Sequence, residues 1–189
     1  MSVDETGPDR NRRQLIIWLW RLPVIGVVAG GAYGLHYGWR IHFGKAPPDE
    51  APAFEPRDPV FVARTGDLPD IWDARPFELG ETPAIAMRLP EPISGGITVA
   101  GKHYAAFSRI CTHLGCTVNF TRDTEAIAVA FNYRSPAPAL TCPCHLSVFR
   151  VDQAGQAASG PAVDPIPRVA LEARGDELYA VGIEQAREA

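Results

Sequence analysis

The sequence lacks a surplus of basic residues, internal repeats and, outside its N-terminal region, sustained helical periodicity. Its 189 residues carry 18 lysines and arginines against 22 aspartates and glutamates, a formal charge of −4. This balance excludes the class of proteins that bind nucleic acid through a basic surface. Charged residues are only 21% of the chain and hydrophobic residues 46%, so the composition indicates a globular protein and not a disordered one.

The N-terminal region differs from the rest in charge and hydropathy. Residues 1–45 carry six basic and three acidic side chains, whereas residues 46–189 carry twelve basic and nineteen acidic ones. The run 15–39 is apolar except for Arg21 and His36, and as a helix it would be about 37 Å long, enough to cross a bilayer. We predict a leader at 1–14 and a single transmembrane anchor at 15–43, with Pro23 in the first turn of the helix.

The leader also indicates how the anchor is oriented. Arg12 and Arg13 stand just before the apolar run, and the segment resembles a twin-arginine export signal. Basic residues before a span place it with its N-terminus in the cytoplasm, so we expect the domain on the periplasmic side of the plasma membrane. No Ala-x-Ala cleavage site follows the span, which favours a retained anchor. The alternative is an apolar hairpin buried in a soluble protein.

The remainder of the chain predicts a linker and a β domain. Residues 44–59 contain five of the 18 prolines, which predicts a semi-extended linker or hinge about which the following domain swings. In residues 60–189 short apolar runs alternate with turn residues, which predicts a mainly β, antiparallel sheet domain. The predicted strands are 60–63, 84–89, 97–99, 104–108 and 127–131, followed by a hairpin with its turn at 174–176.

The four cysteines fall into two clusters, and each cluster contains a histidine. The first reads Cys-Thr-His-Leu-Gly-Cys over 111–116, and the second reads Cys-Pro-Cys-His-Leu-Ser over 142–147. A disulfide framework alone would allow three pairings, but it gives no reason for the histidines. Two thiolates and two imidazoles could bind zinc. If instead one cysteine and one histidine from each cluster bind a metal, the other two cysteines could tie the clusters together.

These two boxes resemble those of the Rieske iron–sulfur proteins, whose patterns are C-x-H-x-G-C and C-x-C-H-x-S. The resemblance implies one [2Fe–2S] cluster per chain, with one iron on Cys111 and Cys142 and the other on His113 and His145. It also implies a disulfide between Cys116 and Cys144. Because both extra cysteines occur together with an anchor and a proline-rich linker, the chain resembles the Rieske subunit of bacterial cytochrome bc complexes. That resemblance implies a membrane location and, as partners, a cytochrome b-type subunit, a c-type cytochrome and quinol.

Simple charge counting connects this ligand set to quinol oxidation. The charges of two ferric ions, two bridging sulfides and two thiolates cancel, so such a centre accepts an electron more easily than one with four thiolates. The added electron raises the pKa of the histidine ligands. We therefore expect electron and proton to be taken up together. By family analogy, His145 is the catalytic ligand that meets the quinol.

Residues beside the boxes carry further expectations from the resemblance. Ser147 matches a serine whose hydroxyl bonds a bridging sulfide. Phe149 stands where high-potential members have a tyrosine, so we expect a lower reduction potential. Leu114 is expected to shield the cluster, and Leu146 replaces a glycine that is common at its position. Residues 159–165 resemble the proline loop that covers the cluster in this family.

Three interpretations remain open at this stage. Residues 122–139 lengthen the interval between the boxes, and we interpret them as a longer hairpin in preference to a partner contact. Within redox chemistry, the alternative function is the Rieske small subunit of an arsenite-oxidase-like molybdoenzyme. From another class, the alternative is an anchored structural zinc domain, which would be redox-silent.

Overall fold

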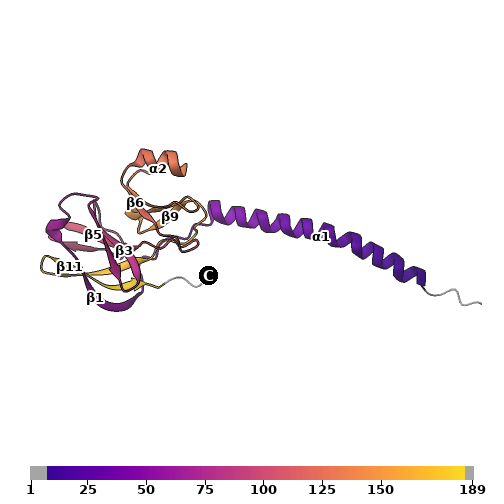
Figure 1. The fold of residues 1–189 in the computed structure, drawn as a ribbon, viewed down its shortest axis with the longest axis horizontal. Helices are drawn as coiled ribbons and strands as arrows, with labels where there is room; N and C mark the ends of the chain where they lie inside the picture. Colours follow the sequence, from indigo (N-terminus) through magenta and orange to yellow (C-terminus); the bar gives the residue numbers. More distant parts are fainter. Residues whose placement is uncertain (1–7, 186–189) are drawn as a thin grey trace, which may run out of the picture. The chain divides into compact units, whose positions relative to one another are not determined.

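The computed structural model describes residues 8–185, in which one long helix is followed by a β domain (Figure 1). The chain divides into two compact units, with the boundary between Arg40 and Ile41. Residues 1–7 of the predicted leader and residues 186–189 of the predicted domain lie outside the described range. The prediction of a mainly β antiparallel domain after an apolar helix is confirmed.

Helix α1 extends over Pro8–Phe43. Its segment Arg12–Phe43 is the one helix in the described part of the chain that is long and apolar enough to cross a membrane. Its apolar side chains are exposed; Val27, for example, is 76% exposed, which suits a lipid environment and not water. Pro23 lies inside this helix, so its predicted place in the first turn is wrong. Pro8 occupies that place, where a missing N–H costs nothing.

Two antiparallel sheets form the domain. The large sheet has seven strands in the order β1-β11-β10-β5-β3-β2, with β4 paired to β5. Its strands are β1 (Phe54–Arg64), β2 (Ala74–Leu79), β3 (Thr82–Leu89), β4 (Ile97–Val99), β5 (Lys102–Ser108), β10 (Arg168–Arg174) and β11 (Glu177–Glu184). The small sheet has four strands in chain order. They are β6 (Asn119–Thr121), β7 (Ala139–Cys142), β8 (Ser147–Arg150) and β9 (Gln156–Ser159).

The burial pattern shows where the core lies. Along β11 half-buried and buried residues alternate strictly, as expected for a strand with one face on the core. The middle of β3 is buried without interruption from Ala84 to Met87, so both faces of this part of the sheet are covered. One core cluster joins β3 and β5 to the small sheet and includes Cys111, Cys142 and Phe149. The small sheet therefore packs on the part of the large sheet formed by β3 and β5.

The segment between the two cysteine boxes corrects two predictions. Residues 124–131 form helix α2 (Thr124–Phe131), so neither a strand at 127–131 nor a hairpin over 122–139 is present. The carboxylate of Asp123 accepts hydrogen bonds from the backbone N–H groups of Glu125 and Ala126 at 2.9 and 3.1 Å, and this caps the helix. Figure 1 shows α2 beyond β6, at the outside of the domain.

The predicted linker at 44–59 is wrong for its second half. Residues 54–59 belong to β1, which pairs with β11. Pro56 and Pro59 are tolerated because β1 is an edge strand, where a missing N–H leaves no ladder bond broken. Residues 44–53 are irregular but bonded to the domain: the hydroxyl of Ser94, for example, donates to the carbonyl oxygens of Asp49 and Glu50 at 2.8 and 2.7 Å.

Candidate metal centre

Two loops carry three of the four cysteines and both histidines, and the fourth cysteine ends the strand before the second loop. The first loop, residues 109–118, joins β5 to β6; the second, residues 143–146, joins β7 to β8. Cys142 ends β7 and Ser147 begins β8, and these two residues are paired across the strands. The pairing of β7 with β8 thus fixes both ends of the second loop.

The first loop is a tight, internally bonded turn. The N–H of Cys111 donates to the carbonyl of Cys116 at 2.8 Å, and the N–H of Gly115 donates to the carbonyl of Cys111 at 2.9 Å. Gly115 has φ +76°, a left-handed conformation that glycine adopts without strain. Arg109 closes the base of the loop, because its Nε donates to the carbonyl of Val118 at 3.0 Å.

The second loop contains a residue in an unfavourable conformation. Leu146 has φ +59° and its side chain is 48% exposed. A left-handed conformation is costly for a branched side chain, and this explains why glycine suits the position that Leu146 occupies. In the first loop Leu114 is 69% exposed. The two leucines therefore place apolar surface next to the two histidines.

A disulfide joins Cys116 to Cys144, so the two loops are covalently tied, with the pairing that the resemblance implied. The other two cysteines, Cys111 and Cys142, are unpaired and buried. Burial raises the pKa of the Cys111 thiol to about 11, and the neighbouring Cys142 thiol contributes to this increase. Such a thiol stays protonated on its own, and a bound metal cation would replace its proton and make it a thiolate ligand.

The histidines form a second pair. The rings of His113 and His145 lie edge to face with their centroids 4.8 Å apart. Nδ1 of His113 is buried and has no hydrogen-bond partner among residues 8–185. Its pKa is lowered by burial and, to a smaller extent, by the nearby His145. A buried nitrogen without a partner is destabilising, and a bound metal ion would satisfy it.

The donor set fits a Rieske cluster. Two buried thiols and two adjacent imidazoles, one with an orphaned nitrogen, are the ligands that a [2Fe–2S] centre with two cysteines and two histidines requires. The same set satisfies tetrahedral zinc, so donor chemistry alone does not separate the two metals. His145 is exposed whereas His113 is half-buried, so the two imidazoles differ in their access to a partner molecule.

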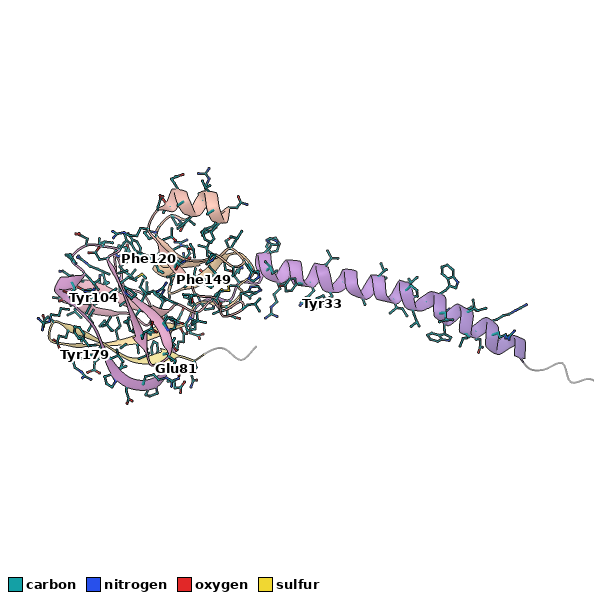
Figure 2. The ribbon with its side chains drawn as sticks, viewed as in Figure 1. Tyr33, Glu81, Tyr104, Phe120, Phe149 and Tyr179 are labelled. Carbon is teal, nitrogen blue, oxygen red and sulfur yellow. A yellow bond between two sulfur atoms is a disulfide. The ribbon has the colours of Figure 1, made fainter. Side chains whose placement is uncertain are left out.

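Ser147 and Phe149 lie directly behind the second loop, and both are fully buried. The Ser147 hydroxyl accepts a hydrogen bond from the N–H of Ala162 at 3.2 Å, so its own proton is free to donate to a group at the centre. Phe149 is surrounded by the domain interior (Figure 2) and brings no hydroxyl group there. The hydroxyl of Thr112 donates to the carbonyl of Asp164 at 2.8 Å, which connects the first loop to the segment 159–165.

One neighbour of the centre was missed by sequence reasoning. The Lys45 ammonium group donates to the carbonyl oxygens of Gly160 and Ala162 at 2.5 and 2.6 Å. Nothing around Lys45 signals this contact, since the residue follows the apolar helix and lies 115 positions from Gly160 in the sequence. Its neighbour Ala46 donates from its backbone N–H to the carbonyl of Val163 at 3.0 Å.

Comparison with known proteins separates iron–sulfur from zinc. Residues 58–170 match the family model of the Rieske [2Fe–2S] domain. The iodate reductase subunit IdrB of Pseudomonas sp. (strain SCT) is 31% identical over 124 residues, which are 64% of this chain and 59% of that protein. The cytochrome bc1 complex Rieske subunit of Streptomyces lividans is 28% identical over 116 residues, 56% of this chain and 61% of that protein.

A solved structure shares the fold. The soluble domain of Rieske protein II from Sulfolobus acidocaldarius has a TM-score of 0.53 and 24% sequence identity, and the match covers 67% of this chain and 78% of that one. The chain spans about three fifths of the length of the two curated relatives. The family match makes this chain a [2Fe–2S] redox protein of the oxidoreductase-subunit type. The chain belongs to the Rieske [2Fe–2S] family.

Proposed function

We propose that this chain is the Rieske electron-transfer subunit of a membrane-attached oxidoreductase that acts on an oxyanion, in the class of the arsenite-oxidase-like molybdoenzymes. The observation that carries the proposal is its similarity to an iodate reductase subunit over 64% of the chain. In this role the chain is not catalytic alone. It passes electrons between a large catalytic subunit and an electron carrier of the membrane, such as a c-type cytochrome.

In this proposal the four ligands have separate roles. Cys111 and Cys142 would hold one iron through their thiolates, and His113 and His145 would hold the other. Nδ1 of His113, which is buried and without a partner among the described residues, is the atom that suits this purpose. When bound, the cluster supplies one-electron oxidation and reduction.

The surrounding residues hold and shield the ligands. The Cys116–Cys144 disulfide fixes the distance between the two loops. Leu114 and Leu146 are exposed, so they would exclude water from the centre when a partner covers them. His145 is exposed beside them, which provides a short route for an electron to a partner docked on this surface.

The long helix fits attachment to a membrane. The segment Arg12–Phe43 is suited to span it, and we infer an orientation with Arg12 and Arg13 in the cytoplasm and the domain in the periplasm, from the positive-inside rule. The twin-arginine motif is consistent with this location, because that export route carries folded proteins whose cofactor is already inserted. A fusion reporter at each end of the chain would measure the orientation.

A second candidate is the iron–sulfur subunit of a quinol–cytochrome c oxidoreductase. It is supported by the similarity to the bc1 complex subunit of Streptomyces lividans and by the exposed ring of His145. In that complex His145 would be the group that meets a quinol, and a cytochrome b-type subunit and a c-type cytochrome would be the partners.

Purification of the intact complex tests the proposal. The tagged full-length chain should be isolated from solubilised membranes of its own organism, and the co-purifying subunits identified with molybdenum and haem analysis. We expect a large subunit and about one molybdenum per chain. Recovery of haem b with a cytochrome b-type subunit, and no molybdenum, would contradict the proposal and support the second candidate.

A further inference from the structure

The segment that follows the long helix is bonded to one particular loop. Besides the two hydrogen bonds from Lys45 Nζ to the carbonyl oxygens of Gly160 and Ala162, at 2.5 and 2.6 Å, the N–H of Ala46 donates to the carbonyl of Val163 at 3.0 Å. Two consecutive residues thus make three hydrogen bonds to the backbone of 160–163. The lysine side chain makes two of them, so a substitution at this single position removes most of the contact.

The loop that Lys45 holds is also bonded to residues beside the candidate metal centre. Ala162 donates from its N–H to the hydroxyl of Ser147 at 3.2 Å, and the carbonyl of Asp164 accepts from Thr112 at 2.8 Å. Gly160 lies so close to the second loop that an added Cβ would be 2.5 Å from the Cα of Ser147. A displacement of this loop would therefore disturb Thr112 in the first loop and Ser147 at the end of the second loop.

Lys45 also brings a charge to a partly buried place. Its side chain is half-buried and burial lowers the pKa of its ammonium group, as expected when a cation loses water and gains only neutral carbonyl partners. A second hydrogen bond fixes the backbone that follows Lys45, because Arg168 donates from Nη1 to the carbonyl of Asp49 at 2.9 Å. These hydrogen bonds therefore hold the charge of Lys45 at a fixed position in the domain.

We propose that Lys45 is a positioning residue of the Rieske centre, whose ammonium group holds residues 160–164 against Ser147 and whose positive charge raises the reduction potential of the cluster. The electrostatic part follows from the sign of the charge, since a fixed cation favours the state that has gained an electron. The proposal depends on the cluster that the family carries and not on which complex the chain serves. If the proposed role in a molybdoenzyme is wrong, the proposal about Lys45 still stands.

A matched pair of substitutions tests it. The chain contains only two lysines, Lys45 and Lys102, and Lys102 lies at the start of β5. Lys45→Met keeps the length of the side chain but removes its charge and both hydrogen bonds, and Lys102→Met removes the same charge elsewhere. The reduction potential of each cluster-loaded, full-length protein is measured by redox titration followed by electron paramagnetic resonance.

For Lys45→Met, the ratio of reduced to oxidised cluster at the wild-type midpoint should fall about three- to tenfold, as expected for a unit charge lost at intermediate distance in a partly screened site. Lys102→Met should leave the ratio unchanged, and Lys45→Arg should retain most of the wild-type value because it keeps the charge. A Lys45→Met potential equal to that of Lys102→Met would overturn the proposal.

If Lys45→Met does not retain its cluster, the contact of Lys45 can be tested in the wild-type protein. Amine acetylation followed by mass spectrometry should label Lys45 at least about tenfold more slowly than Lys102 in the folded, cluster-loaded protein, because both hydrogen bonds must open first. In denaturant the two lysines should react at equal rates. Equal labelling of the two in the folded protein would show that the contact does not hold, and would overturn the proposal.

Discussion

The two sheets of the domain differ in what stabilises them. The large sheet has a core cluster formed by its own residues, among them Leu79, Tyr104 and Leu178, and its strands reach eleven residues in β1. The small sheet has strands of three or four residues and shares its main core with β3 and β5. We therefore expect the small sheet to depend more than the large one on the disulfide and on the contacts of the loops.

The largest effect is expected from a cavity in the core of the large sheet. Leu178 is fully buried there, and Leu178→Ala should lower the free energy of unfolding by about 3–4 kcal/mol. Chemical denaturation followed by circular dichroism measures the change. If the two sheets are stabilised separately, the reduction potential of the variant should equal that of the wild type. A shifted potential would show that the core of the large sheet also controls the centre.

The next effect should come from the disulfide. Replacement of Cys116 and Cys144 by serine releases a loop of 28 residues, and a cross-link of this span contributes about 3.5 kcal/mol in the chain-entropy model. Hydrogen exchange should increase in β7 and β8 while β10 and β11 keep their protection. Uniform loss of protection in both sheets would contradict the comparison. Iron retention on dilution should also decrease, because the two loops are no longer tied.

A smaller loss is expected at the contact between the proline loop and the second loop. Gly160 has φ +77° and a Cβ would collide with the backbone of Ser147, so Gly160→Ala should lower the free energy of unfolding by about 2 kcal/mol. Gly175 is the matched control, because it has φ +68° but open space around it. Thermal unfolding of the two variants separates the collision from the backbone strain that both share. Equal losses would show that Gly160 is not tightly packed.

The smallest change in stability should accompany a clear change in the reduction potential. Phe149 is fully buried behind the centre, and Phe149→Tyr adds a hydroxyl that can donate to a ligand sulfur, so the potential should increase. The free energy of unfolding should change by less than about 1 kcal/mol if the hydroxyl finds this partner. Phe120→Tyr, on β6 of the same small sheet and separated from β8 by β7, is the control and should leave the potential unchanged.

The sequence predicted the large sheet better than the small one, and the reason is physical. Alternation in β11 reflects one buried face, and the apolar Val169 and Leu171 of β10 are buried as well, so the hairpin could be identified without tertiary information. The run at 127–131 is apolar at consecutive positions, which fits a strand and a short helix equally well. Asp123 followed by Glu125 is the available signal for a helix start, but the surrounding β pattern outweighs it.

Part of the metal centre was likewise predictable from the sequence, and part of it was not. The resemblance of the two boxes to the Rieske patterns predicted which cysteines are joined in the structure, Cys116 and Cys144, and which remain free, Cys111 and Cys142. Contacts between distant segments were not predictable: nothing in the sequence pairs Lys45 with Gly160, or Thr112 with Asp164. The predicted linker over 44–59 failed for the same reason, since its prolines indicate an extended chain but not the edge of β11 on which that chain lies.

The contacts of residues 45–50 also bear on motion. A domain that swings about this segment would have to break the hydrogen bonds of Lys45 and Ala46 and those of Ser94 to Asp49 and Glu50. The predicted swinging domain therefore remains a proposal. Lys45→Met should release one end of this segment. Comparing the turnover of the complex that contains this variant with that of the wild-type complex therefore tests the swinging domain.

The central claim is that two cysteines and two histidines hold a [2Fe–2S] cluster in this chain. Electron paramagnetic resonance of the dithionite-reduced, full-length protein, with iron and zinc analysis of the same sample, tests it most directly. We expect a rhombic signal of low average g with about two irons per chain. About one zinc per chain with no such signal would contradict the claim and leave a structural zinc domain in its place.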